Sequence, residues 1–210
     1  MNFSSKYYLW ILCTLMLLAS SCRQNEAGSA AGEEWISLFN GKDLTGWDIK
    51  IACYDLNDNY RNTFRVQDSA IQVVYDEYDS FTTEFGHLYH QTPYAYYRLR
   101  MEYRFNGEQL RGGPDYARLN SGVMVHSQSA ASCDKNQFFP VSLEMQFLAS
   151  DSSVQRPTGN LCTPGTAFVM DGEPSYAHCI DSESPPYDRD EWVSVEVIVL
   201  GDSLIHHVVE

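Results

Sequence analysis

Apolar and polar residues alternate with a period of two in three segments of the chain. Between Tyr97 and Phe105 the odd-numbered positions are apolar and the even-numbered positions are charged. Similar alternation runs through 141–147 and 192–199. Successive side chains of a strand point to opposite faces, so each segment is predicted as a strand with one buried face. Shorter strands are predicted at 36–39, 63–66, 70–74, 122–126 and 204–209.

Turn-forming residues separate these segments, and the sequence shows no long helical stripe of apolar residues. Gly201 and Asp202 are typical of a hairpin turn between the last two predicted strands. The stretches 127–140 and 150–187 are rich in Ser, Pro, Gly and Cys and are predicted as loops, which often carry function on a β scaffold. Many short strands with such punctuation indicate an all-β fold, either a sandwich or a jelly roll.

The first residues have the order of a secretory signal. One positive charge at Lys6 precedes an apolar run over 7–19, and small residues then lead to Cys22. The run is shorter than the roughly 20 apolar residues that a membrane-spanning helix needs. We therefore predict a signal peptide at 1–21, a polar tether at 22–33 and one domain at 34–210.

The small residues that end in a cysteine resemble a bacterial lipobox. This resemblance implies that Cys22 is lipidated. The protein would then lie in the periplasm or at the cell surface, with its lipid in the outer membrane. This lipid anchor would be its only contact with the membrane. The alternative is ordinary signal cleavage, with Cys22 incidental.

Four cysteines fall within the predicted domain: Cys53, Cys133, Cys162 and Cys179. An even number in an exported chain favours disulfides over metal ligation. Four cysteines allow three connectivities. We favour Cys162 with Cys179, which closes a short loop and leaves Cys53 to pair with Cys133.

The charge balance excludes one class of partner. The chain has 14 Lys and Arg against 28 Asp and Glu, a net charge of -14. Nucleic acids are bound by clustered basic residues, so we expect no nucleic-acid partner. No Gly-rich phosphate loop or serine nucleophile elbow is present. No spacing of His, Asp and Glu specifies a metal, so a divalent cofactor stays an open question, as does the oligomeric state.

Three polar strand faces supply the candidate site. They are Glu144 with Gln146, then Asn120, Gly122, Met124 and His126, and then Arg98, Arg100, Glu102 and Arg104. If these strands lie side by side, a carboxylate, amides, an imidazole and a guanidinium share one concave surface. Such a surface suits sugar hydroxyls. The alternative is that these residues are solvated outer-face side chains or cross-strand pairs.

Seven segments of the sequence carry a further signal, and together they span nearly the whole predicted domain: Trp35–Trp47, Phe85–Tyr89, Tyr97–Phe105, Asn120–His126, Leu143–Gln146, Arg156–Thr166 and Gly201–His207. In their residues and in their order they resemble one family of exported bacterial domains, first described as of unknown function and later called 3-keto-disaccharide hydrolases.

The resemblance implies a concanavalin-like jelly-roll β-sandwich with the sugar site on a concave sheet. It also implies activity on glycosides whose ring is oxidised to a ketone at carbon 3. In relatives the last hairpin continues through Asn and Gly, whereas Glu210 stands here where Asn would be. We therefore expect that the domain is truncated at its C-terminus.

A 3-keto sugar needs a general base for the acidified hydrogen on carbon 2, and then loses its aglycone by elimination, with water adding afterwards. We assign the base to Glu144 or His126. Gln146 and Arg104 are expected to hold the substrate or its enolate. The remaining substrate contacts are expected from Glu102, Asn120 and, through the family pattern, His207.

Two other functions stay open. A carbohydrate-binding module would share the sandwich without turnover. A retaining glycosidase would need two carboxylates about 5 Å apart. Glu102 provides the second carboxylate only if its strand lies beside that of Glu144.

Overall fold

A computed structural model describes residues 34–210, of which Leu38–Glu210 form one compact unit. The predicted signal peptide, the tether and Cys22 lie outside the described residues. Among the residues described, no helix has the length and apolar character that crossing a membrane requires.

The described chain forms thirteen strands and three short 3-10 turns, which confirms the all-β class. The strands are β1 (Trp47–Ile51), β2 (Phe64–Gln67), β3 (Ala70–Val73), β4 (Gly86–His90), β5 (Tyr96–Tyr103), β6 (Asn120–Val125), β7 (Leu143–Leu148), β8 (Asn160–Cys162), β9 (Phe168–Met170), β10 (Glu173–Ser175), β11 (Cys179–Ile180), β12 (Val193–Leu200) and β13 (Leu204–Val209). The 3-10 turns are η1 (Tyr60–Asn62), η2 (Asp115–Ala117) and η3 (Ala130–Ser132).

Two sequence predictions of local structure are wrong. No strand forms over 36–39. The chain turns directly afterwards, where Asn40 Oδ1 accepts hydrogen bonds from the amides of Lys42 and Asp43. The stretch 150–187, predicted as a loop, contains the four short strands β8 to β11.

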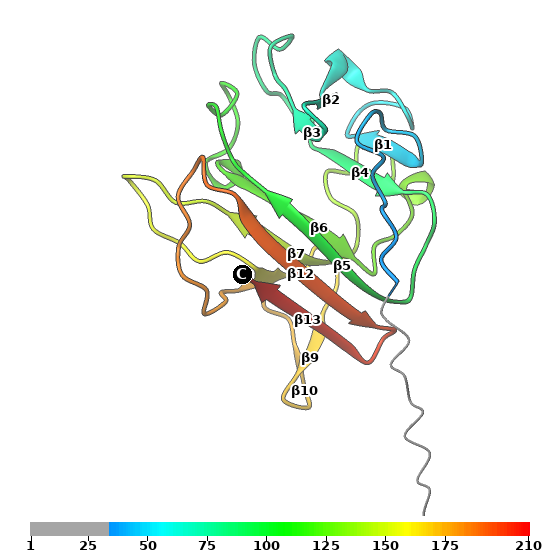
Figure 1. Ribbon diagram of the computed structural model, residues 1–210, viewed down its shortest axis with the longest axis vertical. Coiled ribbons are helices and arrows are strands. Elements are labelled where there is room, and N and C mark those ends of the chain that lie inside the picture. The colour runs from blue at the N-terminus through cyan, green and yellow to red at the C-terminus, as the bar shows by residue number, and fades with distance from the viewer. Residues whose placement is uncertain (1–33) are drawn as a thin grey trace, which may run out of the picture. The chain divides into compact units, whose positions relative to one another are not determined.

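Two antiparallel sheets pack face to face as a β-sandwich (Figure 1). We call them the β7 sheet, of order β11-β8-β7-β6, and the β12 sheet, of order β13-β12-β5. The apolar positions of their alternating strands meet between the sheets. Residues of this core are Val125, Met145, Phe147, Val193, Val195, Val197 and Val199. The even-numbered polar positions of β6 and β7 and those of β5 and β12 therefore lie on opposite outer faces.

A second, smaller core holds the strands β1 to β4, which Figure 1 shows grouped together. β1 pairs with β4, and Ile49, Ile51 and Leu88 pack with Phe64 of β2. The other face of this ribbon carries Lys50, which is only 4% exposed. Its ammonium donates to the carbonyls of Ile51, Tyr54 and Lys135 at 3.1, 3.3 and 3.1 Å. Because these carbonyls come from two segments, Lys50 ties β1 to the long loop between β6 and β7.

The disulfide prediction is half right. Cys162 of β8 is bonded to Cys179 of β11, directly opposite it in the sheet, which confirms that pair. Cys53 and Cys133 are free thiols, so the second predicted pair is wrong. The physical reason is that the two thiols have different neighbours. Cys53 Sγ lies 3.3 Å from the Thr83 hydroxyl, and Cys133 Sγ lies 3.4 Å from the Tyr89 hydroxyl.

Candidate functional site

Glu144 stands on the outer face of the β7 sheet, paired across the strands with Met124 on β6 and Cys162 on β8. Its side chain lies over Gly122. A Cβ at Gly122 would come within 2.8 Å of Glu144 Cγ and would clash with Glu144 Oε1. The missing side chain on β6 is therefore what gives the carboxyl group its place against the sheet.

Burial raises the pKa of Glu144 to about 7. Desolvation disfavours the charged form, and within residues 34–210 no hydrogen-bond donor or cation contacts the carboxylate to offset that penalty. A carboxyl group with this pKa is about half ionised at neutral pH, the condition under which it exchanges protons most readily with a substrate.

Amide groups lie beside Glu144 on the same face. Asn160 Nδ2 donates to Gln146 Oε1 at 3.1 Å, and Asn160 Oδ1 accepts from the Ser182 amide at 2.9 Å. This bond engages the side-chain oxygen of Gln146, and its Nε2 donates no hydrogen bond to any of the described residues. At the start of β6, Asn120 Nδ2 donates to the carbonyl of Tyr116 at 2.8 Å. The face thus combines one base with several neutral hydrogen-bonding groups.

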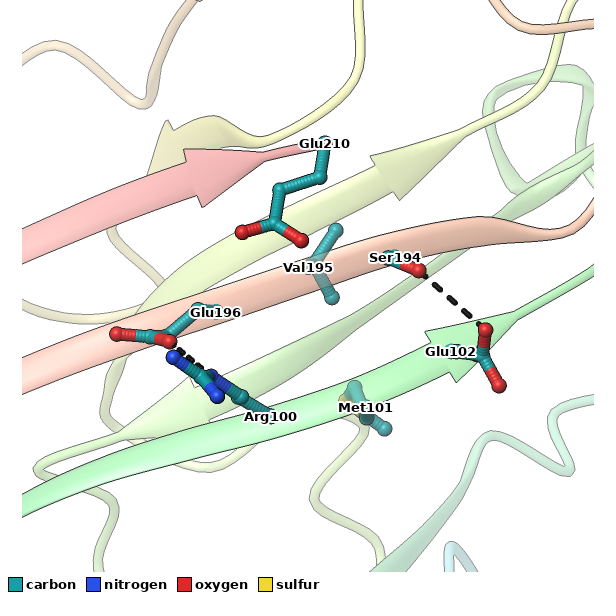
Figure 2. A pocket seen from close by; sticks show the side chains of 7 residues that line it. All are labelled: Arg100, Met101, Glu102, Ser194, Val195, Glu196 and Glu210. Atoms are coloured by element: carbon teal, nitrogen blue, oxygen red, sulfur yellow. Dashed lines mark hydrogen bonds and ion pairs between the residues drawn. The ribbon is translucent and has the colours of Figure 1, made fainter. Parts of the chain in front are cut away.

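The opposite outer face, that of the β12 sheet, carries the other predicted polar residues. A pocket of about 340 Å³ lies there, and Ser194 at its lining donates to Glu102 at 3.3 Å. Figure 2 shows this bond and the ion pair between Arg100 and Glu196. Arg98 also binds Glu196, at 2.7 Å, and both arginines hold the pKa of this buried carboxyl below its usual value. The ion-paired Glu196 is therefore a weak base.

The family comparison matches residues 34–209 to the model of the 3-keto-alpha-glucoside-1,2-lyase-like domain. The chain belongs to this family. The resemblance inferred from the motifs is thereby confirmed, and with it a lyase-like or hydrolase-like function on carbohydrates at the level of the family. No curated protein and no solved structure matches the chain.

In this lyase-like domain the structure separates residues that the sequence placed on one surface. Glu144, Gln146 and Asn120 do share a face. Glu102 lies on the far side of the sandwich, because β5 pairs with β12 and not with β7. Arg104 lies there too, with its guanidinium 4.8 Å from the ring of Trp192.

The two histidines of the prediction lie elsewhere. β6 ends at Val125, and His126 follows it, exposed and with a φ of 50°. The left-handed turn breaks the alternation that placed His126 beside Met124. His207 faces inward from β13, opposite the core residue Val197. Its Nδ1 lies 3.0 Å from the Gly159 carbonyl, its Nε2 is buried without a partner in the described structure, and burial lowers its pKa.

Sequence reasoning missed Asn160, the supporting partner of Gln146. A signal was present, because Asn160 falls in a motif of the family, but nothing in the motif shows that β8 lies next to β7.

The described residues hold no group of three or more His, Cys, Asp or Glu side chains placed so that they could bind a metal ion.

The unfolding free energy of the protein should depend on pH through Glu144. The folded-state pKa of about 7 exceeds the ordinary value of 4.5, so the folded state holds the extra proton between these pH values. The protonated Glu144 therefore contributes to the stability of the folded state at low pH, and this contribution is lost as the pH rises through 7. Glu144→Gln has no such loss. The unfolding free energy of the variant minus that of wild type should therefore increase by up to about 3 kcal/mol between pH 4 and pH 9. Urea unfolding at both pH values measures the change, and a pH-independent difference would contradict it.

Replacing Gly122 by alanine should displace the Glu144 carboxyl group. The added Cβ needs the space of Glu144 Cγ and also lies 2.9 Å from the Met145 carbonyl. We expect the pKa of Glu144 to fall toward its ordinary value as the carboxylate moves into water, which carboxyl-carbon NMR titration measures. Ser121→Ala, on the same strand but the opposite face, is the control and should leave that pKa unchanged.

Proposed function

We propose that the protein cleaves glycosides oxidised at carbon 3, with Glu144 as the general base. The observation that carries this proposal is a half-buried carboxyl group with a pKa of about 7, set among amides on an accessible sheet face. The family is described as a 3-keto-alpha-glucoside-1,2-lyase-like domain, which supports the same chemistry.

The reaction follows from the acidity of the substrate. The ketone at carbon 3 acidifies the hydrogen on carbon 2, and Glu144 takes this proton. The electrons of the C–H bond form an enolate, then re-form the ketone as a C1–C2 double bond is made and the bond from carbon 1 to the leaving oxygen breaks. The leaving oxygen takes up a proton. Addition of water across the double bond would convert this elimination into net hydrolysis.

The neighbouring amides suit the enolate stage. Negative charge builds on the oxygen at carbon 3, and a fixed N–H donor stabilises it most when the donor needs no rearrangement. Gln146 Nε2 is held by the bond between its own Oε1 and Asn160. Gln146 is therefore the proposed enolate donor, and Asn120 is a proposed contact for the sugar hydroxyl groups.

A retaining glycosidase mechanism fits the described site poorly. It needs a second carboxylate about 5 Å from the first, and Glu102, the residue considered for that role, belongs to the opposite face of the sandwich. A binding module without turnover remains the alternative function, and the activity experiment below separates the two.

Activity on a 3-keto-disaccharide should depend on Glu144. In Glu144→Gln the base is lost with little change of shape, so kcat/KM should fall by a factor on the order of 10² to 10⁴. Wild-type activity should rise with pH around a midpoint of about 7, since the ionised form is the base. Glu102→Gln is the matched control on the other face and should retain activity. Mass spectrometry measures the product. Saturable binding of the substrate with no product formed would favour the binding module.

We also propose that the protein is exported and anchored to the outer membrane through lipid on Cys22. The disulfide between Cys162 and Cys179 supports an oxidising compartment. In bacteria supplied with labelled palmitate, the wild-type protein should carry label in the membrane fraction, and Cys22→Ala should carry none. Equal labelling of the two would contradict the proposed site.

A further inference from the structure

Phe85 is the centre of a cluster of aromatic rings, which includes Phe81 at a centroid distance of 5.0 Å. Four of these rings, from three separate segments, form what we call the aromatic wall: Phe85, Tyr116, Phe138 and Phe139. The centroid of the Phe85 ring lies 6.4 Å from that of Tyr116, 5.4 Å from that of Phe138 and 4.8 Å from that of Phe139. The fold thus gathers rings that lie far apart in the sequence.

The aromatic wall is largely open to solvent. Tyr116 is 59% exposed, Phe138 41% and Phe139 38%. In the described part of the chain these rings belong neither to the core between the two sheets nor to the core of β1 to β4. Exposed aromatic surface gathered in one place costs solvation free energy and is typical of a binding site.

The position of Tyr116 places the wall on the side of Glu144. Asn120 projects from the outer face of β6, since it alternates with the core residues Val123 and Val125. Its amide reaches the carbonyl of Tyr116, so the turn η2 lies on that outer side. At the other end of β6, the loop that carries Phe138 and Phe139 is held to β4, where His87 Nε2 lies 2.8 Å from the Phe138 carbonyl. Phe85 contacts the rings from both ends, so the wall runs beside the strand face.

We propose that the aromatic wall binds the sugar ring that leaves. This proposal rests on the proposed function. The reacting ring must present carbon 2 to Glu144 and therefore lies over β6 and β7. Tyr116 comes from the segment before β6, and Phe138 and Phe139 come from the segment after it, at the border of that face, where the next ring of a disaccharide would lie. A pyranose has an apolar face of C–H groups that packs on aromatic rings, and its edge hydroxyls need hydrogen-bonding groups such as the Tyr116 hydroxyl.

The test compares two oxidised substrates. One is a 3-keto-disaccharide, and the other is methyl 3-keto-glucoside, which has no second ring. Tyr116→Ala and Phe139→Leu remove a flat ring and spare the sheets. Each should lower kcat/KM for the disaccharide about tenfold, mainly through KM, and change that for the methyl glycoside less than about twofold. Tyr176→Ala, at a position 84% exposed and outside the wall, is the control and should change neither.

Equal losses on both substrates, or no loss on either, would overturn the proposal. A separate measurement covers failure of the proposed function itself, which would appear as no turnover of either substrate by wild type. Saturation-transfer NMR then follows binding of the unoxidised parent disaccharide. Binding that is lost in Tyr116→Ala and Phe139→Leu but kept in Tyr176→Ala supports the aromatic wall as a sugar site. The same binding in all variants, or no binding by wild type, rejects the aromatic wall as a sugar site.

Discussion

The face-to-face packing of the β7 sheet and the β12 sheet is the constraint on which the rest of the structure depends. A strand alternates its side chains, so burying the valines of β12 against Met145 and Phe147 decides which residues face outward on every neighbouring strand. This one condition brings Glu144 and Gln146 to an accessible face. It also places Glu102 and the ion pairs of Glu196 on the other side, where they cannot act on the same ligand.

Two of the outer-face carboxylates, Glu196 and Glu144, show how the surroundings of a carboxyl group decide its chemistry. Glu196 is almost fully buried, but two arginines offset its desolvation, so its pKa is low and its charge is fixed. Glu144 is less buried but has no such partner in residues 34–210, so its pKa is near neutrality. The ion pairs of Glu196 stabilise a strand face at the expense of the reactivity of the carboxylate. The burial of Glu144 without a charged partner destabilises the protein when Glu144 is ionised, but it keeps a base available, as is common at catalytic sites.

Sequence reasoning succeeded where the information is local. The alternation in 97–105, 141–147 and 192–199 predicts β5, β7 and β12, and the motif order predicts the family. It failed where the outcome depends on which strands are neighbours. Nothing in the alternation around Glu102 shows that β5 pairs with β12, and nothing near Cys53 shows that its thiol meets Thr83. His126 failed for a different reason, because a single left-handed residue ends the strand and its periodicity.

Lys50 shows why the segment next to the site could not be placed from sequence. In the alternation of β1 it occupies a polar position, which would normally be solvated, yet its ammonium is enclosed by three backbone carbonyls. One carbonyl belongs to Lys135, in the loop that also carries Phe138 and Phe139. A buried ammonium is costly unless such acceptors surround it, so the loop and β1 must keep their relative position for either to be stable. The geometry of the aromatic wall therefore depends on an interaction that spans 85 residues of sequence and involves no aromatic residue.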